Sequence, residues 1–364
     1  MEDMSDLKYW VAISQNIKIG AARFKKLYNF FPDMETVWKE ATTTDLTEAG
    51  FTENIAEDFV IRRHDTNPDE EMEKMAKENI KAVTVHDEKY PSMLKELFTP
   101  PAILYYKGDI ESITPHSLAI VGTRKISSYG KLITNQIVQK LAPHEISIIS
   151  GLAHGVDTEA HLTSLKYKTH TVAVLGSGLD HRNIYPAINR RLAEDIVNQG
   201  GVVLSEYPVG MMPLRHNFPA RNRIISGLSK ATLVIEAGEV SGALITANYA
   251  LDQNREVIAV PGNLTNPNSG GTNKLIKQGA IVFTDIEDIL EIFNYQQIKQ
   301  SKVAVTADNP EEEAVIKILS TEPTHIDQLV LKSGLPSSMI SSTLTMMELS
   351  GKVKNLGNMN YVLL

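Results

Sequence analysis

Short apolar runs, separated by glycine-containing turns and amphipathic segments, dominate the middle of the chain. Seven of them predict strands, at 117–121, 146–150, 171–175, 201–205, 231–236, 256–260 and 280–283. Most are continuous Val, Ile, Leu and Ala, as strands covered on both faces require. Helical segments alternate with them, so the pattern predicts an α/β fold with a Rossmann-like, doubly wound parallel sheet over residues 81–295. Residues 81–87 and 102–108 are expected to add a hairpin or edge strands.

Residues 1–70 show a helical pattern instead. Apolar positions at helical spacing are interrupted by a turn from Ile17 to Gly20 and by a second turn, 42–50, which ends at Gly50. This indicates a small all-α domain of SAM-like or helix–hairpin–helix type. A protein-interaction domain is the favoured interpretation, and direct DNA contact through the hairpins is the alternative.

Residues 310–364 follow a polar linker, 296–310, and predict a winged helix: three helices and a terminal hairpin. Thr324 is a candidate N-cap, and the second helix is expected from Ser337 to Ser350, closing on Gly351. That helix has no Arg or Lys, and the segment holds six acidic and four basic residues, a net charge of −2. Because phosphate affinity needs positive charge, protein contact is favoured over DNA contact here.

The overall composition narrows the possible environments and chemistries. The 364 residues include no cysteine, which excludes disulfides and thiolate sites and fits a cytoplasmic protein. The N-terminus does not resemble a signal peptide, and no stretch is apolar enough for a membrane span. The formal net charge is −8, so any nucleic-acid site must be a local basic patch on an acidic body.

Glycine turns follow five of the predicted strands. Parallel strands end at one edge of the sheet, so these turns are expected to gather there. Glycine permits close backbone approach, and free N–H groups at the following helix starts attract anions. The edge is therefore a candidate phosphate site, built from the turns at 121–124, 150–155, 175–178, 236–238 and 260–262.

A basic segment, 214–230, strengthens that hypothesis. It carries Arg215, Arg221, Arg223 and Lys230 without any Asp or Glu, and Phe218 among them could stack on a base. Arg124 on the first turn can grip phosphate with two donors. The alternative is that Arg221 and Arg223 pair with internal acids such as Glu206 or Glu236. In that case they only hold the edge of the sheet together, which we call a stapling role.

Common enzyme signatures are missing from the sequence. It contains no Walker phosphate loop, no G-x-S-x-G elbow and no G-x-G-x-x-G turn. His154, Asp157 and His161 could be imagined as metal ligands, but the order favours Asp157 as a helix N-cap followed by a packed histidine. No catalytic residue, metal or cofactor is expected.

Several long motifs resemble the bacterial DNA-processing protein A family (DprA, also called Smf). They are VGTRKISSYG, SGLAHGVDTEAH, FPARNRIISGLS, EAGEVSGALITANYALDQNREVIAVPG and GGTNKLIKQGA, and the resemblance covers about residues 100–285. It implies a non-enzymatic protein of natural transformation that binds and protects incoming single-stranded DNA. It also implies loading of the RecA recombinase and a homodimer formed through the Rossmann-like domain.

The resemblance places the DNA in a positive pocket at the turn edge. The expected DNA- or phosphate-binding residues are Gly122, Thr123, Arg124, Ser150, Gly151, Arg215, Phe218, Arg221, Asn222, Arg223, Ser241 and Gly242. Arg215 belongs to this set on charge alone. Two alternatives remain, a nucleotide-binding or nucleotide-hydrolysing enzyme on a related fold and a recombination scaffold without DNA binding.

Overall fold

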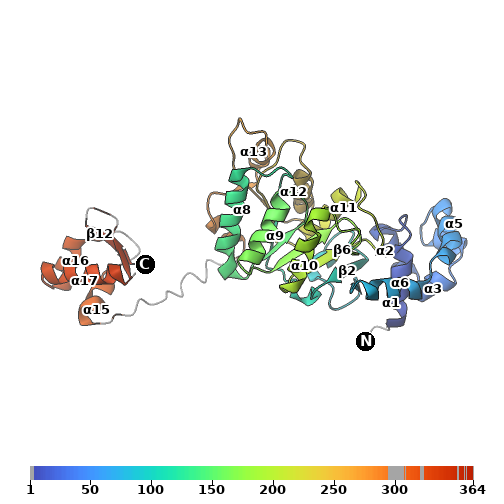
Figure 1. Ribbon diagram of the computed structural model, residues 1–364, viewed down its shortest axis with the longest axis horizontal. Coiled ribbons are helices and arrows are strands. Elements are labelled where there is room, and N and C mark those ends of the chain that lie inside the picture. The colour runs from blue at the N-terminus through green and yellow to red at the C-terminus, as the bar shows by residue number, and fades with distance from the viewer. Residues whose placement is uncertain are drawn as a thin grey trace. The chain divides into compact units, whose positions relative to one another are not determined.

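The computed structural model describes residues 4–293, 307, 309–319, 324–350, 352–355, 357 and 359–363. The chain divides into two compact units, Met1–Phe293 and Asn294–Leu364 (Figure 1). Most of the predicted linker 296–310, and the predicted helix end at Gly351, lie outside the described residues. None of the described helices combines the length and apolar character that a membrane span requires.

The first unit is built around a nine-stranded sheet in the order β1-β2-β6-β5-β4-β3-β7-β8-β9. The strands are β1 Lys81–Thr84, β2 Ile103–Lys107, β3 Ser117–Val121, β4 Ser147–Ser150, β5 Thr171–Leu175, β6 Val202–Ser205, β7 Ala231–Val234, β8 Glu256–Ala259 and β9 Ile281–Val282. All neighbours from β6 to β9 are parallel. β1 and β2 form an antiparallel hairpin at one edge, and β2 pairs antiparallel with β6. The predicted fold class is confirmed, including the edge hairpin.

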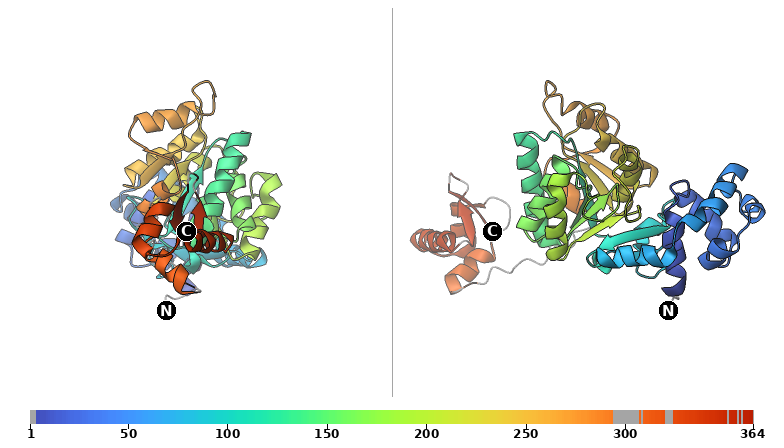
Figure 2. Two further views of the ribbon diagram at one scale, coloured as in Figure 1. Left: turned by 90° about the vertical axis from the view of Figure 1, so that its left-hand side faces the viewer. Right: turned by 45° about the vertical axis from the view of Figure 1, so that its right-hand side comes forward.

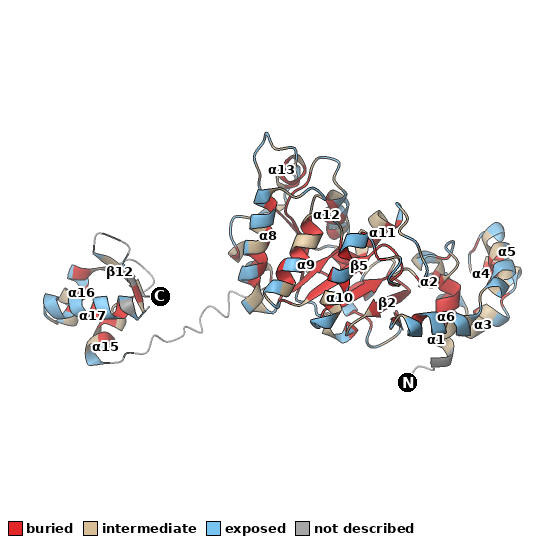
Figure 3. Ribbon diagram, viewed as in Figure 1, coloured by how far each residue is buried: buried red, intermediate tan, exposed pale blue. Residues whose placement is uncertain are grey.

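Helices cover both faces of the sheet (Figures 1 and 2). One layer is formed by α8 Ser128–Leu141, α9 Val156–Lys166 and α10 Arg190–Asn198, and the other by α11 Asn217–Gly227 and α12 Gly242–Asp252. Three shorter helices accompany the sheet: α7 Ser92–Lys95, α13 Gly270–Lys277 and α14 Glu287–Ile292. The strands are therefore buried from both sides (Figure 3), which explains their unbroken apolar sequences.

The strand order creates a switch point between β3 and β7. From β3 the chain winds outward through β4, β5 and β6, then returns through α11 to β7 on the other side of β3. From β7 it winds the opposite way to β8 and β9. The turns that leave β3 and β7 therefore diverge, and ligands of doubly wound sheets bind in the crevice this leaves.

Six helices precede and flank the edge hairpin: α1 Met4–Ser14, α2 Ala21–Phe30, α3 Met34–Lys39, α4 Thr43–Glu48, α5 Glu53–Arg62 and α6 Pro68–Lys77. The prediction of a simple turn over 42–50 was wrong. Thr42 and Asp45 form a reciprocal capping box, which satisfies the first amides of α4 and makes this segment helical.

The helical segment packs directly on the sheet. A single apolar cluster includes Trp10 and Phe24 from the helices and Ile103 and Val203 from the strands. The Ser14 hydroxyl lies 2.6 Å from the Tyr105 hydroxyl in this buried contact. The helices and the sheet are thus one compact unit, so that a groove between them has fixed walls.

The second unit contains α15 Pro310–Ile316, β10 Thr324–His325, α16 Ile326–Ser333, α17 Ser337–Leu349, β11 Val353–Asn355 and β12 Asn360–Leu363. Three helices and a three-stranded sheet agree with the predicted winged helix. Thr324 is not the N-cap, because it lies in β10. His325 takes that place, and its ring Nδ1 accepts from the Asp327 amide.

Candidate functional site

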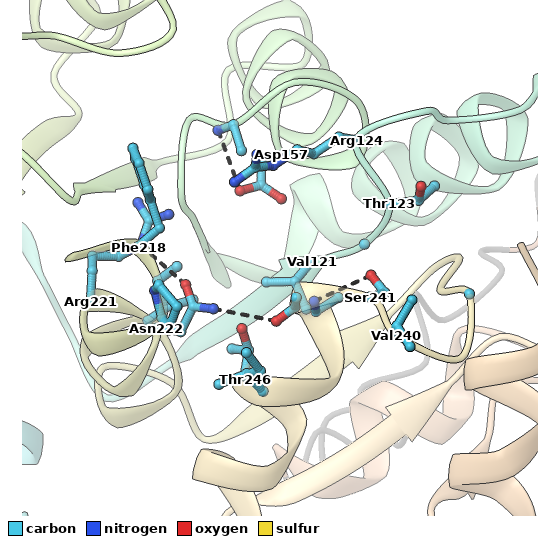
Figure 4. Close-up of a pocket in the computed structure, with 18 of the residues that line it drawn as sticks. Val121, Thr123, Arg124, Asp157, Phe218, Arg221, Asn222, Val240, Ser241 and Thr246 are labelled. Atoms are coloured by element: carbon cyan, nitrogen blue, oxygen red, sulfur yellow. Dashed lines mark hydrogen bonds between the residues drawn. The ribbon is translucent and has the colours of Figure 1, made fainter. Parts of the chain in front are cut away.

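A pocket of about 850 Å³ opens at the switch point (Figure 4). Its lining comes from the turns after β3, β4 and β7, from α11 and the N-terminal halves of α9 and α12, and from the loops before α10, α11 and α13. Nine of the twelve predicted site residues line it, namely Gly122, Thr123, Arg124, Arg215, Phe218, Arg221, Asn222, Ser241 and Gly242. The structure thus brings together segments that are more than a hundred residues apart in the sequence.

The turn after β3 presents Arg124. The Thr123 amide donates to the Glu236 carbonyl at 2.7 Å, and the Val156 amide donates to the Thr123 carbonyl at 3.2 Å. Gly155 makes this approach possible, because its φ is +80° and a Cβ there would lie 2.2 Å from the Thr123 oxygen. Arg124 is exposed, and no carboxylate of the described residues forms an ion pair with it. The fold therefore holds the backbone of this turn firmly and leaves the guanidinium available.

Phe218 stands opposite this arginine, on the first turn of α11. The Arg124 guanidinium carbon lies 5.8 Å from the Phe218 ring centroid, within cation–π range. The Tyr185 ring lies on another side, with 5.6 Å between the ring centroids. Phe218 is partly buried and Tyr185 is exposed. Two aromatic rings and one free guanidinium thus form one wall of the pocket.

Arg221 and Asp157 also line the pocket, and both are buried. Arg221 donates to the Gly151 carbonyl at 2.8 Å and also to the Val174 carbonyl. The Asp157 carboxylate accepts from the amides of Gly151 at 3.1 Å and Ala153 at 3.4 Å. Both side chains therefore organise the turn after β4, and Asp157 lies in the first turn of α9 rather than at its N-cap, Gly155.

Burial is the main cause of the pKa shifts of these two groups. It raises the pKa of the Asp157 carboxyl and lowers the pKa of the Arg221 guanidinium to about 10. The attraction between their opposite charges acts against both shifts. Backbone amides and carbonyls form hydrogen bonds with the two side chains, and such bonds offset the cost of burying polar or charged groups.

Three predicted site residues do not line the pocket. Ser150 is fully buried and donates to the Ile120 carbonyl at 2.7 Å. Gly151 lies behind Arg221, on a small cavity of about 10 Å³. Arg223 faces the other side of α11 and pairs with Glu206 at 2.5 Å, with 15% and 17% of the two side chains exposed. Arg223 thus pairs with an internal acid, as the alternative stapling role described.

The N-terminus of α12 forms the opposite wall. The Ser241 hydroxyl accepts from the Ala243 amide at 3.3 Å and caps this eleven-residue helix. Asn222 reaches across from α11 and donates to the Gly242 carbonyl at 3.4 Å. Gly242 is exposed, and nothing lies within 4 Å of the position of a Cβ. The partial positive charge of a helix start therefore faces the same pocket as Arg124.

Sequence reasoning missed several lining residues. Tyr185 and Asn268 come from loops without a repeated pattern, and Val240 is fully exposed at the rim. The two histidines that the sequence offers as metal ligands differ in accessibility, because His154 is exposed whereas His161 is completely buried. Among the described residues no cluster of three His, Cys, Asp or Glu could hold a metal ion.

Comparison with known proteins agrees with the resemblance seen in the motifs. Residues 81–294 match the family model of DNA recombination-mediator protein A, and residues 299–359 match the DprA winged helix domain. Protein Smf of Synechocystis is 35% identical, with 98% of each chain covered. The DNA processing protein DprA of Bacillus subtilis is 42% identical over 59% of this chain and 71% of its own length.

Solved structures give the same result. DNA processing protein A from Streptococcus pneumoniae is 32% identical with a TM-score of 0.67, covering 78% of this chain and 97% of the other. DNA processing protein A from Helicobacter pylori, studied for its single-stranded DNA binding mode, is 31% identical with a TM-score of 0.53. It covers 60% of this chain and 97% of its own. The chain belongs to the DNA recombination-mediator protein A family, known as DprA or Smf.

Proposed function

We propose that this protein binds single-stranded DNA in the switch-point pocket and does not cleave it. The observation that carries the proposal is the pairing of an accessible Arg124 with the Phe218 ring beside a helix start. A phosphate can take the guanidinium and the helix amides, while a base stacks on the ring. Non-sequence-specific binding of single strands uses this combination of cations and aromatic platforms.

The pocket offers little to a hydrolase. Asp157 is the single carboxylate among the described residues that line it, and its Oδ2 already accepts two backbone amides. Glu236 nearby is engaged as well, because it accepts from the Ser127 amide at 2.9 Å and from the Ser127 hydroxyl at 2.6 Å. A general base must reach the proton it removes, and these carboxylates are held elsewhere. This supports a binding role over the nucleotide-hydrolysing alternative.

The test is a filter-binding assay with an oligonucleotide of about 30 nucleotides, long enough for any single-strand site of ordinary size, in single- and double-stranded form. Tighter binding of the single strand, weakening steeply with salt, is expected. Affinity that does not change with salt would contradict the proposed phosphate contacts. Release of a free base from a nucleoside monophosphate would instead favour the hydrolase.

Family membership suggests the wider role. We propose that the protein protects incoming strands in natural transformation, acts in the cytoplasm as a homodimer, and loads the RecA recombinase. The relatives named DprA support this proposal. The test is a strand-exchange reaction in which single-strand binding protein inhibits the recombinase. The wild-type protein should restore recombinase activity by loading it, and the Arg124→Ala variant should not restore it.

A further inference from the structure

A second hollow, which we call the α2 groove, lies on the other side of α11. It has a volume of about 650 Å³ and runs between the start of α2 and the loop that leads into α11. Its walls include residues 19–24 and 26 of the helical segment and residues 206–208, 211, 214, 216, 217, 220 and 223 of the sheet segment. Figure 1 shows α2 beside the end of the sheet from which α11 starts.

The α2 groove and the switch-point pocket share one wall. Consecutive residues at the start of α11 alternate between them, since Arg215 and Phe218 line the pocket whereas His216 and Asn217 line the groove. Arg215 and His216 are both exposed at the ridge between the two hollows. A polymer that leaves the pocket over this ridge therefore meets the groove next.

The groove is bordered by a second acid-free basic segment. Between Ser14 and Pro32 the sequence has four basic residues, Lys18, Arg23, Lys25 and Lys26, and no Asp or Glu. Lys18 is neutralised by Asp58 at 2.8 Å. The other three donate to backbone carbonyls, and no carboxylate within residues 4–293 forms an ion pair with them. In a chain of net charge −8, this is a local excess of positive charge.

An exposed aromatic ring lies next to this basic segment. Phe98 is 91% exposed, and the Lys25 ammonium lies 5.7 Å from its ring centroid. This repeats the arrangement of Arg124 and Phe218 in the pocket, a cation beside an accessible ring. A large apolar side chain held open to solvent next to a cation is suited to stacking on a base.

The start of α2 offers backbone donors to the groove. This ten-residue helix begins at Gly20 without a side-chain cap, and Gly20, Ala21 and Ala22 line the groove. The partial positive charge of the helix start therefore adds to the charge of the basic segment.

We propose that the α2 groove and Phe98 form a second binding segment for the same DNA strand, continuous with the pocket over Arg215 and His216. This inference rests on the proposed single-strand binding in the pocket. It assigns to the helical segment a direct role in DNA contact. The strand's phosphates face the basic start of α2, and one base stacks on Phe98.

The test compares affinities for oligothymidylates of about 5 and about 25 nucleotides, the first short enough for the pocket alone. The test variants are Lys25→Gln/Lys26→Gln and, separately, Phe98→Ser. Phe98 is exposed, so its replacement should not change the stability of the fold. The matched control is Lys140→Gln/Lys166→Gln, which removes the same charge from exposed helix ends, with Lys166 also over an aromatic ring at 4.9 Å.

We expect each test variant to bind the short strand like the wild type and the long strand about 5- to 10-fold more weakly. The double lysine variant loses two phosphate contacts, and Phe98→Ser loses the stacking of one base. The control should bind both like the wild type. Unchanged affinity for the long strand, as expected if a protein segment occupies the groove, would overturn the inference. An equal loss with both lengths would also overturn it. Failure of the wild type to bind either strand would instead refute the proposed function itself.

A thymidine analogue that cross-links on illumination can locate the strand directly. Placed at successive positions of the long oligonucleotide, it should label Tyr185 or Phe218 from one part of the strand and Phe98 from another. Labelling of the pocket residues from every reactive position, with none of Phe98, would contradict a continuous path.

Discussion

The Arg124 guanidinium faces the Phe218 ring at 5.8 Å, although 94 positions of sequence, 218 minus 124, separate the two residues. Arg124 lies on the turn after β3, and Phe218 lies in the first turn of α11, the helix that crosses to β7. They meet because α11 starts at the edge of the sheet where β3 ends and then crosses the sheet from β6 to β7. The predictions below follow from this contact and from the groups that support it.

Arg124→Ala should weaken single-strand binding without loss of stability. The side chain is exposed and forms no ion pair within the described residues, so the variant loses only the contact with the Phe218 ring. The free energy of unfolding should therefore change by less than about 1 kcal/mol. Removing one phosphate contact should lower the slope of log affinity against log salt by about 0.7. Titration at several salt concentrations measures this. Arg191→Ala is the control, because its side chain is 90% exposed on α10, away from the pocket lining.

Phe218→Leu should reduce affinity through lost stacking. A base stacked on an aromatic ring contributes about 1–3 kcal/mol, which leucine cannot replace, whereas Phe218→Tyr keeps the ring. We expect the leucine variant to bind about 5-fold or more weakly and the tyrosine variant to retain nearly all affinity. Fluorescence anisotropy with a labelled oligonucleotide measures both. Equal affinities of the two variants would show that the ring only packs against Tyr185.

Arg223→Ala should act mainly on stability. Its partner Glu206 would be left largely buried and unpaired, which costs on the order of 3 kcal/mol. Chemical denaturation should show this loss, and the double variant Arg223→Ala/Glu206→Gln should recover part of it. Recovery in the double variant identifies the ion pair as the cause. If the arginine variant were fully stable and unable to bind DNA, the stapling role would be wrong.

Gly151→Ala should destabilise the turn after β4. A Cβ there would lie 2.7 Å from Arg221 Nη2 and 2.7 Å from Asp157 Oδ2, and hydrogen bonds hold both groups in place. Crowding of this kind costs about 1–3 kcal/mol. Gly242→Ala is the control, because nothing lies within 4 Å of its Cβ position. Thermal melts should separate the two variants clearly.

The free energy of unfolding should fall in mild acid because of the buried His161. Burial lowers the pKa of its imidazole from 6.5 to about 3, and Nδ1 lies 2.8 Å from the Thr171 hydroxyl. Below pH 6.5 the unfolded chain takes up a proton that the folded chain refuses, so stability falls as pH decreases from 6.5 toward 3. The limiting slope is about 1.4 kcal/mol per pH unit.

The variant His161→Gln isolates this contribution. It should be less stable than the wild type near neutral pH, because the packed ring is lost. Its unfolding free energy should then fall less steeply between about pH 6 and pH 4, since no imidazole titrates. Parallel pH profiles of the two proteins would contradict a neutral, buried His161.

The α/β architecture could be predicted because it depends on local patterns. Strands buried on both faces need unbroken apolar runs, and the runs at 117–121 and 171–175 coincide with β3 and β5. The error at 42–50 also has a local cause. The capping box of Thr42 and Asp45 supplies hydrogen bonds that a reading of polar residues as a turn does not count.

The sequence by itself determined the sheet, the edge where its glycine turns gather, and the acid-free basic segment that crosses there. It did not determine which of the segment's arginines is available, because the chemistry of each is decided by distant partners. Arg221 donates hydrogen bonds to carbonyls of β5 and of the turn after β4, and Arg223 forms an ion pair with Glu206. Arg215, in contrast, is exposed. A buried charge must be compensated wherever the fold places it, and only the tertiary structure shows where that compensation comes from.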